Sequence, residues 1–205
     1  MKIRYVIGID EVGRGPLAGP LAVCALAAPN IYQKHFRKTF PGVFDSKQVK
    51  PKDRERWLEV IKSEREAGRL NYAVTFVGPE TIDGKGLTFC INKAIASSLK
   101  KLKIKPEECR VLLDGGIKAP PEYIFQETII KGDAKEAVIG LASIAAKVAR
   151  DNRMKFLSKK YSEFDFAKHK GYGTLAHRQA IEKFGLTKIH RRSFLKKMFE
   201  TGSEK

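Results

Sequence analysis

The sequence is poor in cysteine, and it contains no long apolar run. Its three cysteines, Cys24, Cys90 and Cys109, are widely spaced and form no CxxC pair. This excludes a disulfide framework and gives no indication of a zinc site, so we expect buried free thiols in a reducing cytosol. The apolar run near the N-terminus ends at Asp10, too early for a signal peptide, and no run approaches a membrane span. We therefore expect a cytoplasmic protein that does not bind membranes.

Acidic residues are scarce relative to basic ones. The 205 residues include 40 Lys and Arg against 23 Asp and Glu, which gives a net charge of +17. Residues 134–205 alone hold 17 basic and 7 acidic side chains, a net charge of +10. Such a charge favours a polyanionic partner, most often nucleic acid. The length and the 42% hydrophobic content suit one domain with a core of its own.

The pattern of apolar residues predicts an α/β fold with a mixed sheet. Strands are expected at residues 3–9, 19–28, 70–77, 110–113 and 123–130, and helices at 51–67, 79–99, 136–161, 174–184 and 188–199. Residues 30–46 are expected to be irregular and 201–205 to be a frayed tail. The first three strands are close enough in sequence to pair antiparallel, and the long helical connection after the third permits a parallel neighbour.

Acidic residues stand at the ends of three predicted strands. Asp10, Asp114 and Asp133 occupy these ends, and Glu11 directly follows Asp10. Each is by itself a common turn residue, but strand ends are where ligand crevices form in α/β sheets. Neighbouring carboxylates repel one another, so a fold that gathers them needs a cation. Oxygen ligands without His or Cys suit Mg²⁺ or Mn²⁺, and two such ions would offset four negative charges.

Several motifs, in order along the chain, resemble those of the ribonuclease HII family within the RNase H-like superfamily. They are DEVGRGPLAGP (10–20), DSK (45–47), LDG (113–115), KGD (131–133), ASIAAKVARD (142–151), HKGYGTLAH (169–177) and HRRSF (190–194). The resemblance extends from residue 5 to about residue 195. A small departure is Gly140 and Leu141, where the family usually has alanines.

The resemblance implies an RNase H-like fold, with a mixed five-stranded sheet flanked by helices and a helical C-terminal extension. We expect a catalytic domain at residues 1–160 and a helical segment at 161–205 packed on it as one compact unit. The implied activity is a metal-dependent ribonuclease H of type 2. Such an enzyme cleaves RNA in RNA–DNA hybrids and nicks duplex DNA 5′ of a single ribonucleotide, leaving 3′-hydroxyl and 5′-phosphate ends.

The resemblance also implies roles for particular residues. The four carboxylates that bind the metal ions, Mg²⁺ or Mn²⁺, fall on Asp10, Glu11, Asp114 and Asp133. The loop that contacts the ribose 2′-hydroxyl falls on Gly13, Arg14 and Gly15, and the tyrosine that stacks on the next sugar falls on Tyr172. Lys47 and Lys147 are either phosphate contacts or plain surface lysines.

The remaining charged and imidazole side chains receive non-catalytic interpretations. Structural hydrogen bonding is the favoured interpretation for His169, His177 and His190, since two-metal hydrolysis requires no histidine. Arg150, Arg191 and Arg192 are expected at the solvated positive surface or on the hybrid backbone.

Two alternatives stay open at this stage. Ribonuclease HIII typically carries an extra N-terminal DNA-binding domain and another residue in place of Arg14, whereas here the acid pair already stands at residue 10. A non-catalytic basic RNA-binding module explains the charge but not the four acids. We expect a monomer that binds hybrid and ribonucleotide-containing DNA. Residues 194–199 are interpreted as a core-capping helix, and contact with a sliding clamp has no support in the sequence.

Overall fold

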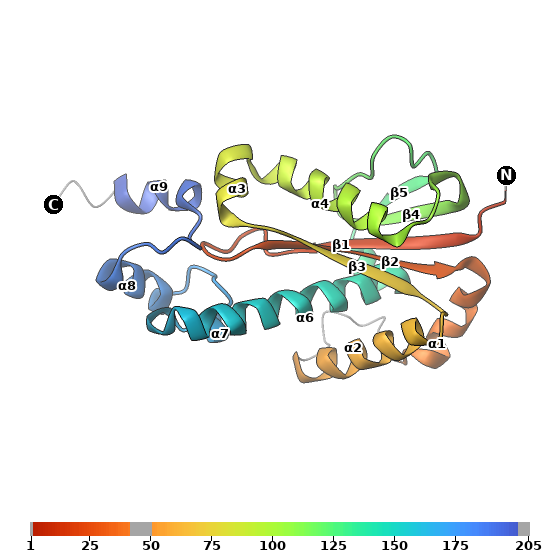
Figure 1. Cartoon of the computed structure of the whole chain (residues 1–205), viewed down its shortest axis with the longest axis horizontal. Helices are drawn as coiled ribbons and strands as arrows, with labels where there is room; N and C mark the ends of the chain where they lie inside the picture. Colours follow the sequence, from red (N-terminus) through yellow and green to blue (C-terminus); the bar gives the residue numbers. More distant parts are fainter. Residues whose placement is uncertain (1, 42–50, 201–205) are drawn as a thin grey trace.

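A five-stranded mixed sheet forms the centre of the molecule (Figure 1). The computed structural model describes residues 2–41 and 51–200, so the 45–47 motif with Lys47 lies outside the described residues. The strands are β1 (Tyr5–Val12), β2 (Leu21–Pro29), β3 (Asn71–Val77), β4 (Cys109–Asp114) and β5 (Gln126–Ile129). Their order is β3-β2-β1-β4-β5; the β3-β2-β1 pairs are antiparallel and the β1-β4-β5 pairs are parallel. The predicted mixed sheet and its antiparallel first half are confirmed.

Helices cover both faces of this sheet. Figure 1 shows α3 (Pro79–Lys85) and α4 (Leu87–Leu102) on one face, and on the other α6 (Ala137–Lys160) with α2 (Pro51–Glu66) beyond it. The alternation of a strand explains the two cores, because Ile7 and Ile9 of β1 pack on the α4 side while Val6 packs on the α6 side. The three cysteines are buried and free, as expected.

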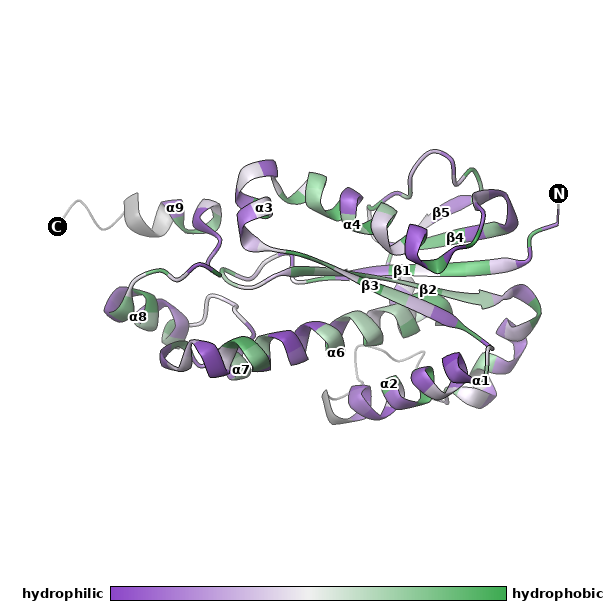
Figure 2. Ribbon diagram, viewed as in Figure 1, coloured by the Kyte–Doolittle hydropathy of each residue, from purple (hydrophilic) through white to green (hydrophobic). Residues whose placement is uncertain are grey.

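Helix α6 lies directly on β1 because Gly8 has no side chain. A Cβ atom on Gly8 would lie 2.2 Å from the Val138 carbonyl carbon, closer than any real contact. Figure 2 shows α6 hydrophobic along the half beneath the sheet and more hydrophilic further on. In the described part of the chain, no helix is long and apolar enough to cross a membrane.

The C-terminal segment packs against the end of α6 and the loop after β1. It comprises the 3-10 helix η4 (Ser162–Phe164), α7 (Phe166–His169), α8 (Leu175–Phe184) and α9 (Arg192–Glu200). Ala18, Met154, Phe166 and Leu195 share one buried cluster, which joins the two parts. A division at residue 160 stays a prediction.

Several element boundaries differ from the predicted ones. The helix expected at 79–99 is two helices, because Gly86 adopts a φ of 80° between α3 and α4. Part of the region expected to be irregular forms the 3-10 helix η1 (Asn30–His35) and α1 (Phe36–Thr39), and a further 3-10 helix η3 (Pro106–Glu108) precedes β4. The short helix α5 (Gly132–Lys135) was not predicted. The last strand is shorter than expected, and α9 begins at Arg192 rather than at residue 188.

Candidate active site

The first acidic residue of the site is buried near the carboxyl end of β1. Asp10 is 5% exposed, and its Oδ1 accepts a hydrogen bond of 2.8 Å from the Glu11 amide. The pKa of Asp10 is raised to about 7, chiefly by burial and to a lesser extent by the charges of Glu11 and Asp114. Lys147 opposes this, as does the Ser143 hydroxyl on α6, which is close to Asp10 although not in full hydrogen-bonding geometry. Asp10 is therefore held in an environment that disfavours its own charge.

Glu11 shares this environment. Burial raises its pKa, and Asp114 adds to the increase, while Arg14 opposes it through a hydrogen bond of 3.0 Å from Nη1 to Glu11 Oε1. The other carboxylate oxygen, Oε2, is buried and has no hydrogen-bond partner within the described residues. An unpartnered buried carboxylate oxygen beside other carboxylates lacks a cation or a donor.

Asp114 and Asp133 come together through a backbone contact. In the parallel pair of β1 and β4, Ile9 lies opposite Leu113, so Asp10 and Asp114 stand at the same end of the sheet. Asp114 Oδ1 accepts a hydrogen bond of 2.7 Å from the Gly132 amide. This contact fixes the start of α5 at the end of β4, and buried Asp133 is the next residue. All four predicted acids therefore lie around the carboxyl ends of β1 and β4.

The donor set fits a hard cation in chemistry and charge. In residues 2–41 and 51–200, no three His, Cys, Asp or Glu side chains are grouped closely enough to enclose a metal ion. The four carboxylates would therefore have to move closer together around one. A bound cation would favour the ionised forms of Asp10 and Glu11, whose pKa values are raised. It would also provide a partner for the buried Oε2 of Glu11. Oxygen-only donors suit Mg²⁺ or Mn²⁺.

The glycine loop directly follows these acids. Gly13 has a φ of +89°, and a Cβ there would lie 2.3 Å from Arg150 Nε, so only glycine is accommodated. Arg14 and Gly15 are exposed. The loop continues to Leu17, whose amide donates a hydrogen bond of 2.8 Å to the Gly171 carbonyl.

That contact brings the predicted recognition tyrosine next to the glycine loop. Tyr172 is 47% exposed, and the Arg150 guanidinium lies 5.9 Å from its ring centroid. Its amide donates to the His169 carbonyl, and its carbonyl accepts a hydrogen bond of 2.9 Å from His177 Nδ1. The half-exposed ring on a tightly bonded backbone suits a binding contact better than core packing.

The three histidines have structural hydrogen bonds, as expected. His190 Nδ1 accepts from the Thr187 amide at 2.9 Å, so its Nε2 carries the proton and donates to His177 Nε2 at 3.1 Å. His177 Nδ1 then donates to the Tyr172 carbonyl. Both rings are buried and neutral, and burial lowers the pKa of His177 and that of His190, the latter to about 4.

The expectation that the arginines lie at the surface was wrong for two of the three. Arg150 and Arg191 are 1% and 0% exposed, whereas Arg192 is exposed. The guanidiniums of Arg150 and Arg191 donate to backbone carbonyls instead of to phosphates. These two side chains therefore hold the backbone around the site in place. Sequence reasoning also assigned no role to Ser143. Arg150, Arg191 and Ser143 each lie within one of the motifs that carry the family resemblance. The motifs do not indicate what these side chains contact.

Comparison with known proteins settles the family. The model of the Ribonuclease HII family matches residues 7–200. The chain belongs to the ribonuclease HII family. A ribonuclease HII of Clostridium beijerinckii is 41% identical over 95% of this chain and 69% of its own length. One of Caldicellulosiruptor bescii is 40% identical over 94% and 87%. Ribonuclease HII membership makes the chain an RNase H-type endonuclease of type 2, which excludes the non-catalytic RNA-binding module.

Solved structures of ribonucleases H share the fold. Ribonuclease H2 of Pyrococcus horikoshii superposes with a TM-score of 0.78 at 27% identity, covering 98% of this chain and 100% of that one. The Archaeoglobus fulgidus RNase HII, solved in complex with PCNA, gives 0.70 at 24% identity over 91% and 93%. Bst-RNase HIII with Mn²⁺ gives 0.68 at 17% identity over 100% and 72%. The last two, at this identity, show the fold alone.

Proposed function

We propose that this ribonuclease HII nicks duplex DNA 5′ of a single embedded ribonucleotide and cleaves the RNA strand of RNA–DNA hybrids, using two divalent cations. The observation that supports this most is the set of buried and half-buried, mutually repelling carboxylates beside a glycine loop at one end of the sheet. The carboxylates supply a place for cations, and the loop supplies backbone groups next to that place.

The four acids, Asp10, Glu11, Asp114 and Asp133, would hold Mg²⁺ or Mn²⁺. When bound, a pair of such ions supplies an activated water for in-line attack on phosphorus and stabilises the leaving 3′-oxygen. The protein's own part is to gather these acids at one end of the sheet. Lys147, beside Asp10, favours the ionised carboxylate that a cation requires. The ion pair of Arg14 with Glu11 involves a 55% exposed side chain, so it is weak enough to be exchanged.

Recognition of the ribonucleotide would come from the glycine loop and Tyr172. The 2′-hydroxyl is the group that distinguishes one RNA residue within DNA, and it lies in the minor groove. Gly13, Arg14 and Gly15 can bring backbone groups to it. The Tyr172 ring would pack on the following deoxyribose, where a 2′-hydroxyl would crowd it, and so report the step from RNA to DNA.

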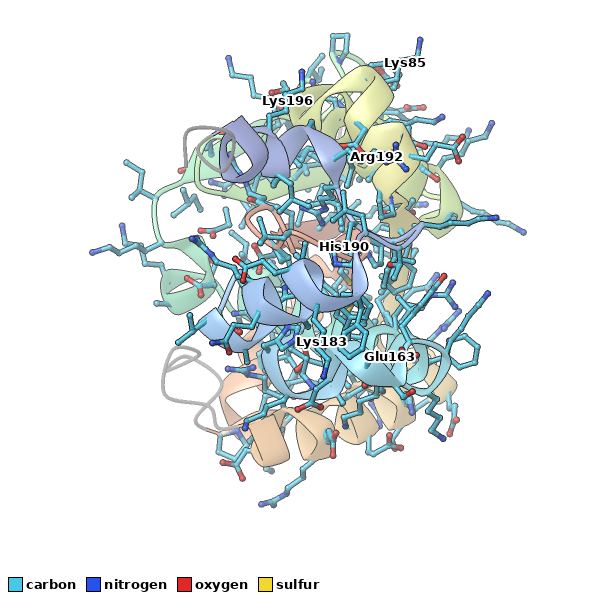
Figure 3. The ribbon with its side chains drawn as sticks, turned by 90° about the vertical axis from the view of Figure 1, so that its left-hand side faces the viewer. Lys85, Glu163, Lys183, His190, Arg192 and Lys196 are labelled. Atoms are coloured by element: carbon cyan, nitrogen blue, oxygen red, sulfur yellow. The ribbon has the colours of Figure 1, made fainter. Side chains whose placement is uncertain are left out.

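Exposed basic side chains support nucleic-acid binding at the end of the molecule that carries α3, α8 and α9. Figure 3 looks onto this end and shows Lys85 and Lys196 near α3 and α9, with Lys183 on α8. Together with the net charge of +17, they would attract the phosphate backbone. Action as a monomer stays a prediction, and contact with a sliding clamp, such as the PCNA of the Archaeoglobus fulgidus complex, stays an alternative that the sequence does not support.

A gel assay tests the proposal. A DNA duplex with one internal ribonucleotide is incubated with Mg²⁺ or Mn²⁺, with and without chelator, and the product ends are mapped. We expect a single nick 5′ of the ribonucleotide that the chelator abolishes. Asp10→Asn should lose most turnover, whereas the control Asp165→Asn, on an exposed residue away from the acids, should keep it. Cleavage that survives chelation, or a nick at another position, would contradict the proposal.

A further inference from the structure

The glycine loop rests on a buried cation that nothing in the proposed chemistry uses. We propose that Arg191 is a positioning residue, which turns two adjacent amides of the glycine loop outward as a donor pair for the ribose 2′-hydroxyl oxygen. This inference rests on the proposed function, since it concerns how the same site recognises a ribonucleotide.

The Arg191 guanidinium donates to three carbonyls of one loop. Nη2 donates to the Gly13 carbonyl at 2.6 Å and to the Gly19 carbonyl at 2.9 Å, Nη1 to the Arg14 carbonyl at 2.9 Å, and Nε to the Gly19 carbonyl at 3.1 Å. Its own backbone amide donates to the Leu17 carbonyl at 2.8 Å. The side chain is fully buried, and one planar fork therefore holds both ends of the loop.

Peptide geometry converts these contacts into an orientation of the loop's amides. In a trans peptide the C=O and the following N–H point in opposite directions, and the described residues contain no cis bond. The Gly13 carbonyl belongs to the same peptide unit as the Arg14 amide, and the Arg14 carbonyl to the same unit as the Gly15 amide. Because Arg191 draws both carbonyls inward, both amides face outward. Within the described residues, neither amide makes a hydrogen bond.

Stability alone does not account for this arrangement. Arg191 makes no ion pair with any carboxylate in the described part of the chain, so its charge is buried among carbonyl dipoles. Burial of a cation without a counter-ion is unfavourable; an apolar side chain would avoid that cost but would leave three loop carbonyls without this donor. A lysine would place one compact charge there, which cannot match three carbonyls in a plane. What the guanidinium specifically provides is the fixed direction of two peptide units.

Arg192 is a matched control for its neighbour. It has the same side chain one position later, but it is exposed, and Figure 3 shows it at the surface near α9. Its backbone amide donates to Asp83 Oδ2, so a change in its side chain leaves that contact in place. Arg150 is unsuitable as a control because its guanidinium also lies against the Tyr172 ring.

The test compares Arg191→Met, Arg191→Lys and Arg192→Met. The readout is the ratio of affinities for a duplex with one ribonucleotide and the same duplex without it, measured in chelator so that nothing is cleaved, together with kcat/KM in Mn²⁺. We expect both Arg191 variants to lose the preference and at least about tenfold in kcat/KM, which is about 1.4 kcal/mol. Their affinity for the all-DNA duplex should be unchanged, and Arg192→Met should retain the preference.

Three results would overturn the inference. A preference fully retained in Arg191→Met would do so, and restoration of the preference by lysine would show that charge suffices without the fork. An equal loss for both duplexes would show only a disturbed structure. If the variants fail to fold, amide-resolved NMR of the wild-type protein tests whether the two loop amides bind the ribonucleotide. The Arg14 and Gly15 amides should shift with the ribonucleotide duplex and not with the all-DNA duplex, and no difference would refute the role. Wild-type protein that never nicks the ribonucleotide duplex would refute the proposed function instead.

Discussion

Replacement of Asp10 by asparagine should make the metal-free protein more stable while it removes most of the cleavage activity. Burial raises the pKa of Asp10 from its ordinary value of 3.8 to about 7. At 1.36 kcal/mol for each pKa unit, keeping this carboxylate ionised in the folded protein costs about 4 kcal/mol above pH 7. An asparagine at this position carries no charge, and its Oδ1 can still accept the hydrogen bond from the Glu11 amide.

The sign of the pH dependence follows from where the proton is held. The folded protein binds the Asp10 proton more tightly than the unfolded chain, so the contribution of Asp10 to the free energy of unfolding falls as pH rises from about 4 to about 7 and then levels off. The buried amide of the variant loses about 2 kcal/mol of this gain if its N–H groups find no partner. We therefore expect an advantage for Asp10→Asn of roughly 2 kcal/mol at pH 8, or roughly 4–8 °C in Tm, and almost none at pH 5.

Chemical and thermal denaturation in chelator between pH 5 and pH 8 would measure this difference. Asp165→Asn serves as the control, since an exposed carboxylate should show no such pH-dependent gain. Added Mn²⁺ should raise the Tm of the wild-type protein and leave that of Asp10→Asn nearly unchanged, because a cation offsets the charge that the variant lacks. The reasoning is refuted if the variant is the less stable protein at pH 8, or if its advantage does not change with pH.

Three further predictions concern packing, acid stability and recognition. Gly8→Ala should cost about 3 kcal/mol in urea denaturation, because its Cβ would meet the backbone of α6, whereas Gly84→Ala, with open space around it, should gain about 0.5 kcal/mol; equal effects would refute the packing. Since burial lowers the pKa of His190 to about 4, the contribution of His190 to the unfolding free energy should fall as pH drops from about 6.5 toward 4, opposite to that of Asp10, so the stability of the wild-type protein relative to His190→Gln should fall over that range; a difference that does not change with pH would contradict it. Tyr172→Ala should reduce cleavage at a single ribonucleotide more than binding of a long hybrid; equal losses would argue against stacking.

The sheet and its acidic end could be predicted because short-range signals fix them. Apolar runs bounded by Gly and Pro locate the strands, and the lengths of the connections decide which pairs run antiparallel. Strand ends then bring Asp10 and Asp114 to the same place, whatever the details of packing. The positions of Gly13 and Tyr172 came from the family resemblance, which residue patterns alone do not supply.

The buried arginines could not be predicted from local sequence. Arg191 contacts carbonyls of Gly13 and Gly19, more than 170 positions earlier in the chain, and its neighbours in sequence are basic like a solvated surface. Nothing in a window of ten residues indicates which arginine turns inward. The length of β5 was also missed: the Gln126 side chain bonds the Ala119 amide and the Tyr123 carbonyl, and the strand begins at Gln126 instead of Tyr123.

The buried arginines do not pair with the acidic residues of the site, and there is a physical reason for this. Arg150 and Arg191 lie close beneath the loop that follows Glu11, yet the hydrogen bonds recorded for them go to backbone carbonyls. Glu11 is already paired with the exposed Arg14, but a buried guanidinium paired with Asp10 or Glu11 would lower the pKa of that acid further and would neutralise the charge that attracts a cation. Carbonyl partners let the arginines shape the loop without that effect. If these acids bind metal ions as proposed, the raised pKa values of Asp10 and Glu11 are the stability cost of leaving the site open for them.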